Sequence, residues 1–448
     1  MFTLEKNSFP NPENVKDAID YNETLRADYN KMDNYYNGEH DIVSRRKSDL
    51  FKNNIVIVNH ARYITQINVG YMLGNEVEYQ SENDIELVTK AYRNQTISLI
   101  DVKLAVAASK FGKAYERVYL DGNNPISTVL DPRNCVIAYD DTVKHSVLFV
   151  VLYEKTEKPA GYKNITVYTE NNQIEFTYKQ KFIMGDNTDN PLGSIPVIEY
   201  VNNDSECGDY KPVIPSIDAY NLLQSDRLND KQQLVESIMT MKGYDLTEEL
   251  REDLIENRTL SNLPVDSETA YLSKTLNEAE VDILRKVIEA DIHKISMTPN
   301  LSDENFVGNS SGVAIKYKLL PFEQNIVNKV RFFEMGLRKR FEIYNKYLSN
   351  LKNQEVVEAS DIEIVFKRNL PQNDLETSQI IANLSGKVSD ETLIGQLSFI
   401  SDAAKEIETA QKESLDRANL ESPQFGTGLP DQGNQNNLNI NQDDTGNI

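Results

Sequence analysis

The chain has 448 residues, of which 39% are hydrophobic, with 47 basic and 70 acidic side chains and a formal net charge of −23. This length allows two or three compact units. The charge argues against a protein that wraps nucleic acid tightly, because such proteins neutralise phosphates with Lys and Arg. It is compatible with solubility alone, or with a wall past which DNA slides without adhering.

The cysteines and apolar runs predict a protein of an aqueous, reducing compartment. Cys135 and Cys207 lie far apart and form no CxxC pair, so we expect no disulfide framework. The N-terminus has no apolar stretch of the kind that secretory signals carry. The longest apolar run, 147–153, is far too short to span a bilayer, and we therefore expect no membrane contact.

The first two hundred residues predict an α+β unit. Hydrophobic spacing predicts helices over 13–36, 61–73, 85–93 and 99–111, and residues 77–79 alternate like a strand. A short β-branched run over 54–58 leads into the second helix. Gly38 is well placed to end the first helix. Strands then dominate, and we expect them over 115–120, 127–130, 147–153, 165–169 and 174–178. Asn171 and Asn172 suit a hairpin turn, so the sheet should be mostly antiparallel.

Helices dominate the remainder of the chain. After Pro212 and Pro215 we expect a helix over 217–241 with a polar centre, short pieces over 242–276, and a helix over 277–297 with one narrow apolar stripe. A longer helix over 313–351 should bend at Pro321, which lacks a backbone donor. A strand over 362–366, a last helix over 389–407 and a disordered acidic tail beyond 421 complete the pattern.

Catalytic and metal-binding motifs are missing from the sequence. Neither Gly112-Lys113 nor Gly386-Lys387 has the spacing of a phosphate-binding Walker A loop. The four histidines stand at no ligand spacing, and no GxSxG or HExxH occurs. Asp140-Asp141 and Asp443-Asp444 are better explained as solvated turns than as cation sites. We therefore predict no enzyme activity, no cofactor and no metal.

The Gly/Ser/Asn-rich stretch 305–312 lies between two predicted helices and carries the apolar residues Phe306 and Val307. A loop in this position is well placed to project into a cavity or the centre of a ring. Gly and Asn are also common in any helix–helix connection, so composition alone favours an inert linker equally. Phe306 could equally lie against its own helix.

Six phrases follow one another in an order that resembles the portal proteins of tailed double-stranded-DNA phages, in the subfamily of long-tailed phages of Gram-positive hosts. They are YYNGEHDI at 35–42, NIVIVN at 54–59, GYMLGNEV at 70–77, NSSGVAIKYKL at 309–319, RNLPQN at 368–373 and VSDETL at 388–393. Together they cover nearly the whole chain up to the tail.

The resemblance implies an α+β portal-type subunit that assembles into a ring, usually of twelve copies. The implied parts are a wing (1–215), stem helices (216–241 and 277–297), a clip (242–276), a tunnel loop (298–312), a kinked wing helix and strand (313–368), a helical crown (369–420) and a disordered acidic tail (421–448). Asn305, Phe306, Asn309, Ser310 and Ser311 would be the tunnel-loop residues that touch DNA.

The resemblance also implies a function and partners. The ring would stand at one capsid vertex of the virion, nucleate head assembly, and let genomic DNA enter during packaging and leave at infection. Its partners would be the terminase large subunit, a head–tail adaptor, the major capsid and scaffolding proteins, and the passing DNA. It would be synthesised in the host cytoplasm. One alternative is another virion structural ring, such as a head–tail adaptor or a minor head morphogenesis protein. The other is an enzyme of head morphogenesis, such as a protease or nuclease, which the missing catalytic motifs argue against.

Overall fold

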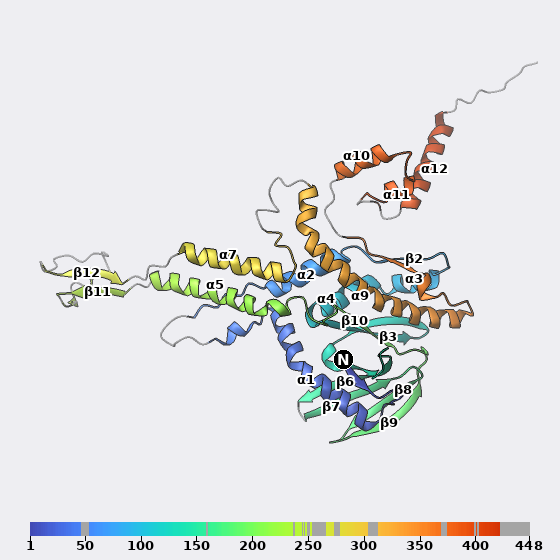
Figure 1. The fold of residues 1–448 in the computed structure, drawn as a ribbon, viewed down its shortest axis with the longest axis horizontal. Coiled ribbons are helices and arrows are strands. Elements are labelled where there is room, and N and C mark those ends of the chain that lie inside the picture. Colours follow the sequence, from blue (N-terminus) through green and yellow to red (C-terminus); the bar gives the residue numbers. More distant parts are fainter. Residues whose placement is uncertain are drawn as a thin grey trace, which may run out of the picture. The chain divides into compact units, whose positions relative to one another are not determined.

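The computed structural model describes residues 1–45, 53–157, 160–235, 238–243, 245, 247–248, 251–252, 266–272, 278–302, 312–368, 374–397, 400 and 403–421. The chain divides into two compact units, Met1–Leu370 and Pro371–Ile448 (Figure 1). Helices and strands both contribute to the first unit, which confirms the predicted α+β class. The described part of the second unit contains α10 (Asp374–Leu384), α11 (Asp390–Ile394) and α12 (Ala403–Glu421).

A six-stranded sheet with the order β1-β5-β6-β7-β8-β9 forms one part of the first unit. Its strands are β1 (Phe2–Leu4), β5 (Cys135–Asp140), β6 (Val147–Glu157), β7 (Ala160–Tyr168), β8 (Asn172–Tyr178) and β9 (Phe182–Asp189). All neighbours are antiparallel except β1 and β5, which confirms the expected mostly antiparallel sheet. The helix α1 (Pro12–Asn37) buries Val15 and Ile19 in the core of this sheet.

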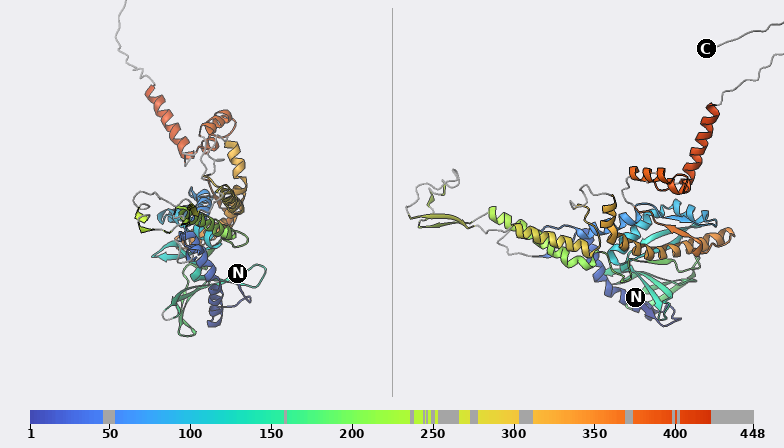
Figure 2. Two further views of the ribbon diagram at one scale, coloured as in Figure 1. Left: turned by 90° about the vertical axis from the view of Figure 1, so that its left-hand side faces the viewer. Right: turned by 45° about the horizontal axis from the view of Figure 1, so that its top comes forward.

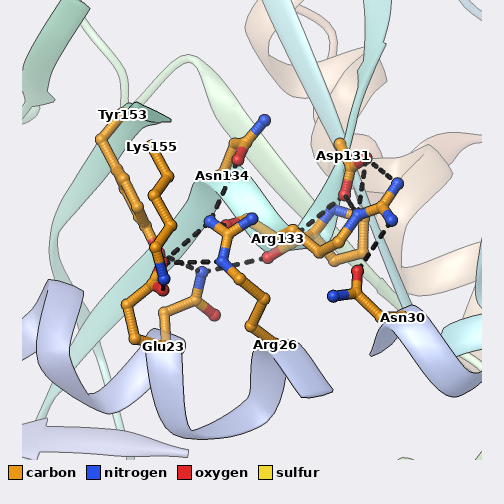
Figure 3. A network of polar contacts seen from close by, with 10 residues as sticks. Glu23, Arg26, Asn30, Asp131, Arg133, Asn134, Tyr153 and Lys155 are labelled. Atoms are coloured by element: carbon orange, nitrogen blue, oxygen red, sulfur yellow. Dashed lines mark hydrogen bonds and ion pairs between the residues drawn. The ribbon is translucent and has the colours of Figure 1, made fainter. Parts of the chain in front are cut away.

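Polar contacts fix α1 at one end of that sheet, next to η2 (Pro132–Asn134). Arg26 donates to the Arg133 carbonyl at 2.5 Å and to Glu23 at 2.8 Å (Figure 3). Glu23 in turn accepts from the Tyr153 hydroxyl at 2.9 Å and pairs with Lys155. These groups are partly buried, so the contacts fix the position of the helix more than simple surface pairs would.

A second, three-stranded sheet has the order β10-β3-β4 and lies against helices. Its strands are β3 (Lys113–Asp121), β4 (Asn124–Leu130) and β10 (Val197–Val201), and the surrounding helices are α2 (His60–Leu73), α3 (Glu86–Asn94), α4 (Ile97–Phe111) and α9 (Gly312–Lys352). A short pair, β2 (Glu78–Gln80) with β13 (Glu363–Val365), joins distant parts of the chain. Leu104, Ile326, Leu337 and Phe341 are fully buried in the shared core.

The long helix α9 is fixed to this core by a buried ion cluster. Arg340 is 0% exposed and donates to both Glu116 oxygens at 2.8 and 2.9 Å and to Asp101 at 2.6 Å. The Tyr200 hydroxyl donates to Glu116 at 2.5 Å. Burial raises the pKa of Asp101, because removal from water disfavours its charged form. Pro321, at which the sequence predicts a bend, lies inside α9. Figure 1 shows the helix bending after its first turns.

Most predicted helices are confirmed, including α1 with Gly38 at its end, α2, α3, α4, α7 (Glu278–Ile295) and α9. The β-branched run over 54–58 forms no strand. This β-branched segment is extended, but it pairs with none of the described strands, and its N–H groups bind side chains of α5 (Ile214–Val235) instead.

Two predicted helices are too long. The helix over 217–241 ends at Val235, and Ile238–Lys242 forms the strand β11, because it pairs with β12 (Glu268–Leu272) about thirty residues later. The helix over 389–407 is two helices, α11 and α12, with Gly395 following the first. The strands β1, β5, β9 and β10 and the helix α10 were not predicted from the sequence.

Candidate functional site

The candidate site is the pair of helices α5 and α7, which we call the stem hairpin. The two helices lie side by side (Figure 2). Beyond them the strands β11 and β12 pair antiparallel, with Ile238 opposite Leu272 and Lys242 opposite Glu268. The hairpin therefore continues from a helical pair into a two-stranded ribbon.

Contacts between α5 and α7 show that the helices run in opposite directions. Lys231 pairs with Glu278 at 2.6 Å at the outer end, and Arg285 binds Tyr220 nearer the body. The apolar core of the pair lies at the root, where Ile217 and Ile292 are fully buried. The outer half is held by exposed ion pairs, which contribute little stability.

A second side of α7 carries apolar side chains that nothing described covers. Ile283 is 63% exposed, and Val287, four residues later on the same side of the helix, is 51% exposed. Ile288, which packs towards the root core, follows Val287 by one residue, and one residue turns an α-helix by about 100°. The exposed stripe therefore faces a different direction from α5. This exposed stripe consists of Ile283 and Val287.

The chain leaving α7 is held by α2 through side-chain bonds. The Tyr63 hydroxyl donates to the Pro299 carbonyl at 3.1 Å and accepts from the Leu301 N–H at 2.9 Å. Asn68 donates from Nδ2 to the Thr298 hydroxyl at 2.9 Å, and both residues are buried. These bonds fix the backbone of 298–301 against the body.

The same helix holds the start of α9. The Tyr71 hydroxyl donates to Glu323 at 2.5 Å, and its ring centre lies 4.8 Å from that of Phe322. Arg368 donates to the other oxygen of Glu323 at 2.9 Å. Consequently α2 is bonded to the described chain on both sides of 303–311.

An aromatic cluster joins α2, α5 and α7 at the root of the hairpin. The ring of His60 lies 4.9 Å from Tyr220 and 5.8 Å from His293, and Tyr63 lies 5.6 Å from His293. His60 Nε2 is buried and has no hydrogen-bond partner among the described residues. Burial lowers the pKa of His60 to about 4, so its ring is neutral at neutral pH.

The predicted DNA-contacting residues, Asn305, Phe306, Asn309, Ser310 and Ser311, all lie outside the described residues. The sequence analysis missed the anchors Tyr63 and Asn68. A polar Asn68 inside the apolar spacing of α2 was a signal, because a buried amide needs partners and these are often distant in sequence.

Two further findings concern metal binding and membrane spans. Among the described residues, no group of three His, Cys, Asp or Glu side chains is arranged to hold a metal ion. No helix in the described ranges is long and apolar enough to cross a membrane.

Comparison with known proteins identifies the family. The model of the phage portal protein family, SPP1 Gp6-like, matches residues 16–419. The chain belongs to this family. The match confirms both the resemblance and the portal function that the sequence predicts. The portal protein of Bacillus phage SPP1 is 24% identical over 447 residues, covering 90% of this chain and 86% of that protein.

A second portal relative and two solved particles are also similar. The portal protein of Clostridium phage phiCD119 is 21% identical, covering 92% of this chain and 97% of its own length. Chains from the virion and from the neck of a native gene transfer agent particle are 12% identical, with TM-scores of 0.42 and 0.44. The matches cover 78% and 76% of the chain described here, and 88% and 89% of the two particle chains. Both TM-scores are too low to establish a common fold.

Proposed function

We propose that copies of this chain assemble into a ring at one capsid vertex and that the stem hairpins wall a channel for genomic DNA. The exposed apolar stripe of α7 carries this proposal, because it gives each hairpin one side for α5 and another for a neighbouring copy. Because these side chains are already partly buried, covering the rest of each would stabilise an interface by about 1 kcal/mol. The role is structural rather than catalytic.

A twelve-membered ring of hairpins has a suitable size. With one helix of each hairpin facing the channel, twelve helices ~10 Å apart give a circumference of ~120 Å and a diameter between axes of ~38 Å. Subtracting a helix diameter of ~10 Å leaves roughly 28 Å, which admits a duplex without gripping it. The net charge of −23 supports passage without adhesion.

The partners follow from the same arrangement. The β11–β12 ribbon, which begins at Ile238, just before the predicted clip (242–276), would contact the terminase large subunit during packaging and a head–tail adaptor afterwards. The wing (1–215 and 313–368) and crown (369–420) would contact the capsid and scaffolding proteins. The tunnel loop (298–312), with Asn305, Phe306, Asn309, Ser310 and Ser311, would touch the passing DNA, and α2 supports this by fixing 298–301.

Electron microscopy with a matched pair of variants tests ring assembly. The purified protein should give rings with a central hole, and Val287→Glu should abolish them, because it places a charge in the apolar stripe. Val143→Glu makes the same substitution at a fully exposed residue outside the stem hairpin and should leave the rings intact. Folding of both variants is checked by circular dichroism. Rings formed equally by Val287→Glu would refute the role of the stripe.

Shortening 303–311 tests the DNA contact separately. Rings should still form, because the bonds of α2 lie outside the deletion. Packaged DNA, measured by nuclease protection in a packaging assay, should fall. Normal packaging by intact rings after this deletion would contradict the assigned loop.

A further inference from the structure

A row of polar side chains on α5 holds the extended segment 53–58. Asn221 accepts from the Val58 N–H at 2.8 Å, Ser225 from the Val56 N–H at 2.9 Å, and Asn229 from the Asn54 N–H at 2.8 Å. The three helix residues are buried. We call these three contacts the ladder.

The ladder has matched spacings. Its helix residues are four apart, which advances about 6 Å along an α-helix. Its partners on the segment are two apart, which advances about 6.6 Å along an extended chain. Because the two advances agree, successive side chains of α5 meet every second N–H of the segment. A shift of the segment by one residue would break every contact. The ladder therefore fixes the register of α5 against the segment.

His40 lies behind the first contact of the ladder. Its Nε2 is 3.0 Å from the Tyr35 carbonyl, which can only accept, so Nε2 carries the proton. Its Nδ1 is 2.9 Å from Asn221 Nδ2 and, in the neutral ring, accepts from that amide. Asn221 thus uses its oxygen for Val58 and its nitrogen for His40.

We infer that Asn221, Ser225, Asn229 and a neutral His40 are positioning residues that set the register of stem helix α5, and that a proton on His40 releases this register. A protonated ring would aim a donor at the Asn221 donor. If the amide flips to accept from His40, it turns its NH₂ group towards the Val58 N–H. Either arrangement leaves a donor unpaired, which is unfavourable. The importance of α5 as a stem rests on the proposed function.

The surroundings of His40 favour the neutral ring. It is buried and stacks on Tyr35, with ring centres 4.5 Å apart. Asp218 accepts from the Tyr35 hydroxyl, Asp41 pairs with Lys31, and the Asn59 amide also lies near. These groups favour protonation, but burial outweighs them and lowers the pKa of His40 below its ordinary 6.5. The register is therefore held fully above pH 6.5 and is lost as the pH falls through the lower folded value.

Hydrogen exchange of the full chain tests the inference. Exchange of the 53–58 amides, corrected for the intrinsic effect of pH, should become about tenfold faster between pH 7.5 and 5.5. His40→Gln cannot take up a proton in this range and should abolish that acceleration. His145→Gln, at an exposed histidine, should behave like the natural protein.

Two ladder variants keep the test decisive if His40→Gln fails to fold. Asn221→Ala should accelerate exchange about tenfold at both pH values and remove the pH dependence. Asn229→Ala, at the far end, should accelerate exchange while keeping the pH dependence. Exchange that does not change with pH, or that changes equally without His40 and Asn221, would overturn the inference. Ring formation, measured on the same samples by mass photometry, separately tests the proposed function.

Discussion

Arg340 is a single positive charge that serves two buried carboxylates, Glu116 and Asp101. Replacing it by Met removes the only charge that offsets them in this cluster and should destabilise the protein by about 3–5 kcal/mol, measured by urea unfolding. Adding Glu116→Gln to Arg340→Met should recover part of this loss. Lys16→Met breaks an exposed pair and should change nothing measurable. If the Arg340→Met variant is as stable as the natural protein, the ion cluster makes no net contribution to the free energy of unfolding.

Two helical glycines provide a matched test at the level of elements. A methyl group on Gly336 of α9 would lie 2.4 Å from the buried ring of Tyr200 in β10, whereas one on Gly70 of α2 would meet nothing within 4 Å. Gly336→Ala should therefore destabilise the fold by about 1–3 kcal/mol, because α9 must move off the sheet. Gly70→Ala should stabilise it by about 0.5–1 kcal/mol through helix propensity. Thermal unfolding of both variants measures the difference, and equal shifts would contradict the close packing at Gly336.

Helices with clear periodicity were predictable, and elements defined by distant partners were not. The positions of α1, α2, α7 and α9 follow from their own apolar spacing and end signals. The strand β11 exists because 268–272 pairs with it, and the segment 54–58 is extended because α5 binds it. Neither partner can be read from the local sequence. The site was predictable as two facing helices, but the anchors Tyr63 and Asn68 depend on contacts more than 200 residues away.

The charge of the whole molecule leads to a prediction about DNA. With 70 acidic and 47 basic side chains, purified rings should bind duplex DNA more weakly than about 100 µM at ~0.15 M salt, because few phosphate counterions can be released. Mobility shift of a short duplex, with a basic DNA-binding protein as a positive control, measures this. A shift at low micromolar protein would show that basic side chains gather on an accessible surface despite the total charge.

The double attachment of α2 has a consequence for how this architecture can diversify. Tyr63 and Asn68 secure the exit from α7, and Tyr71 separately secures the entry to α9. Neither attachment depends on how many residues join them. Insertions or deletions between 302 and 312 could therefore accumulate during evolution without displacing either helix, since lengthening a connection adds little entropic penalty. On the proposed function, such changes in length would alter the width of the channel while α2, α7 and α9 keep their positions.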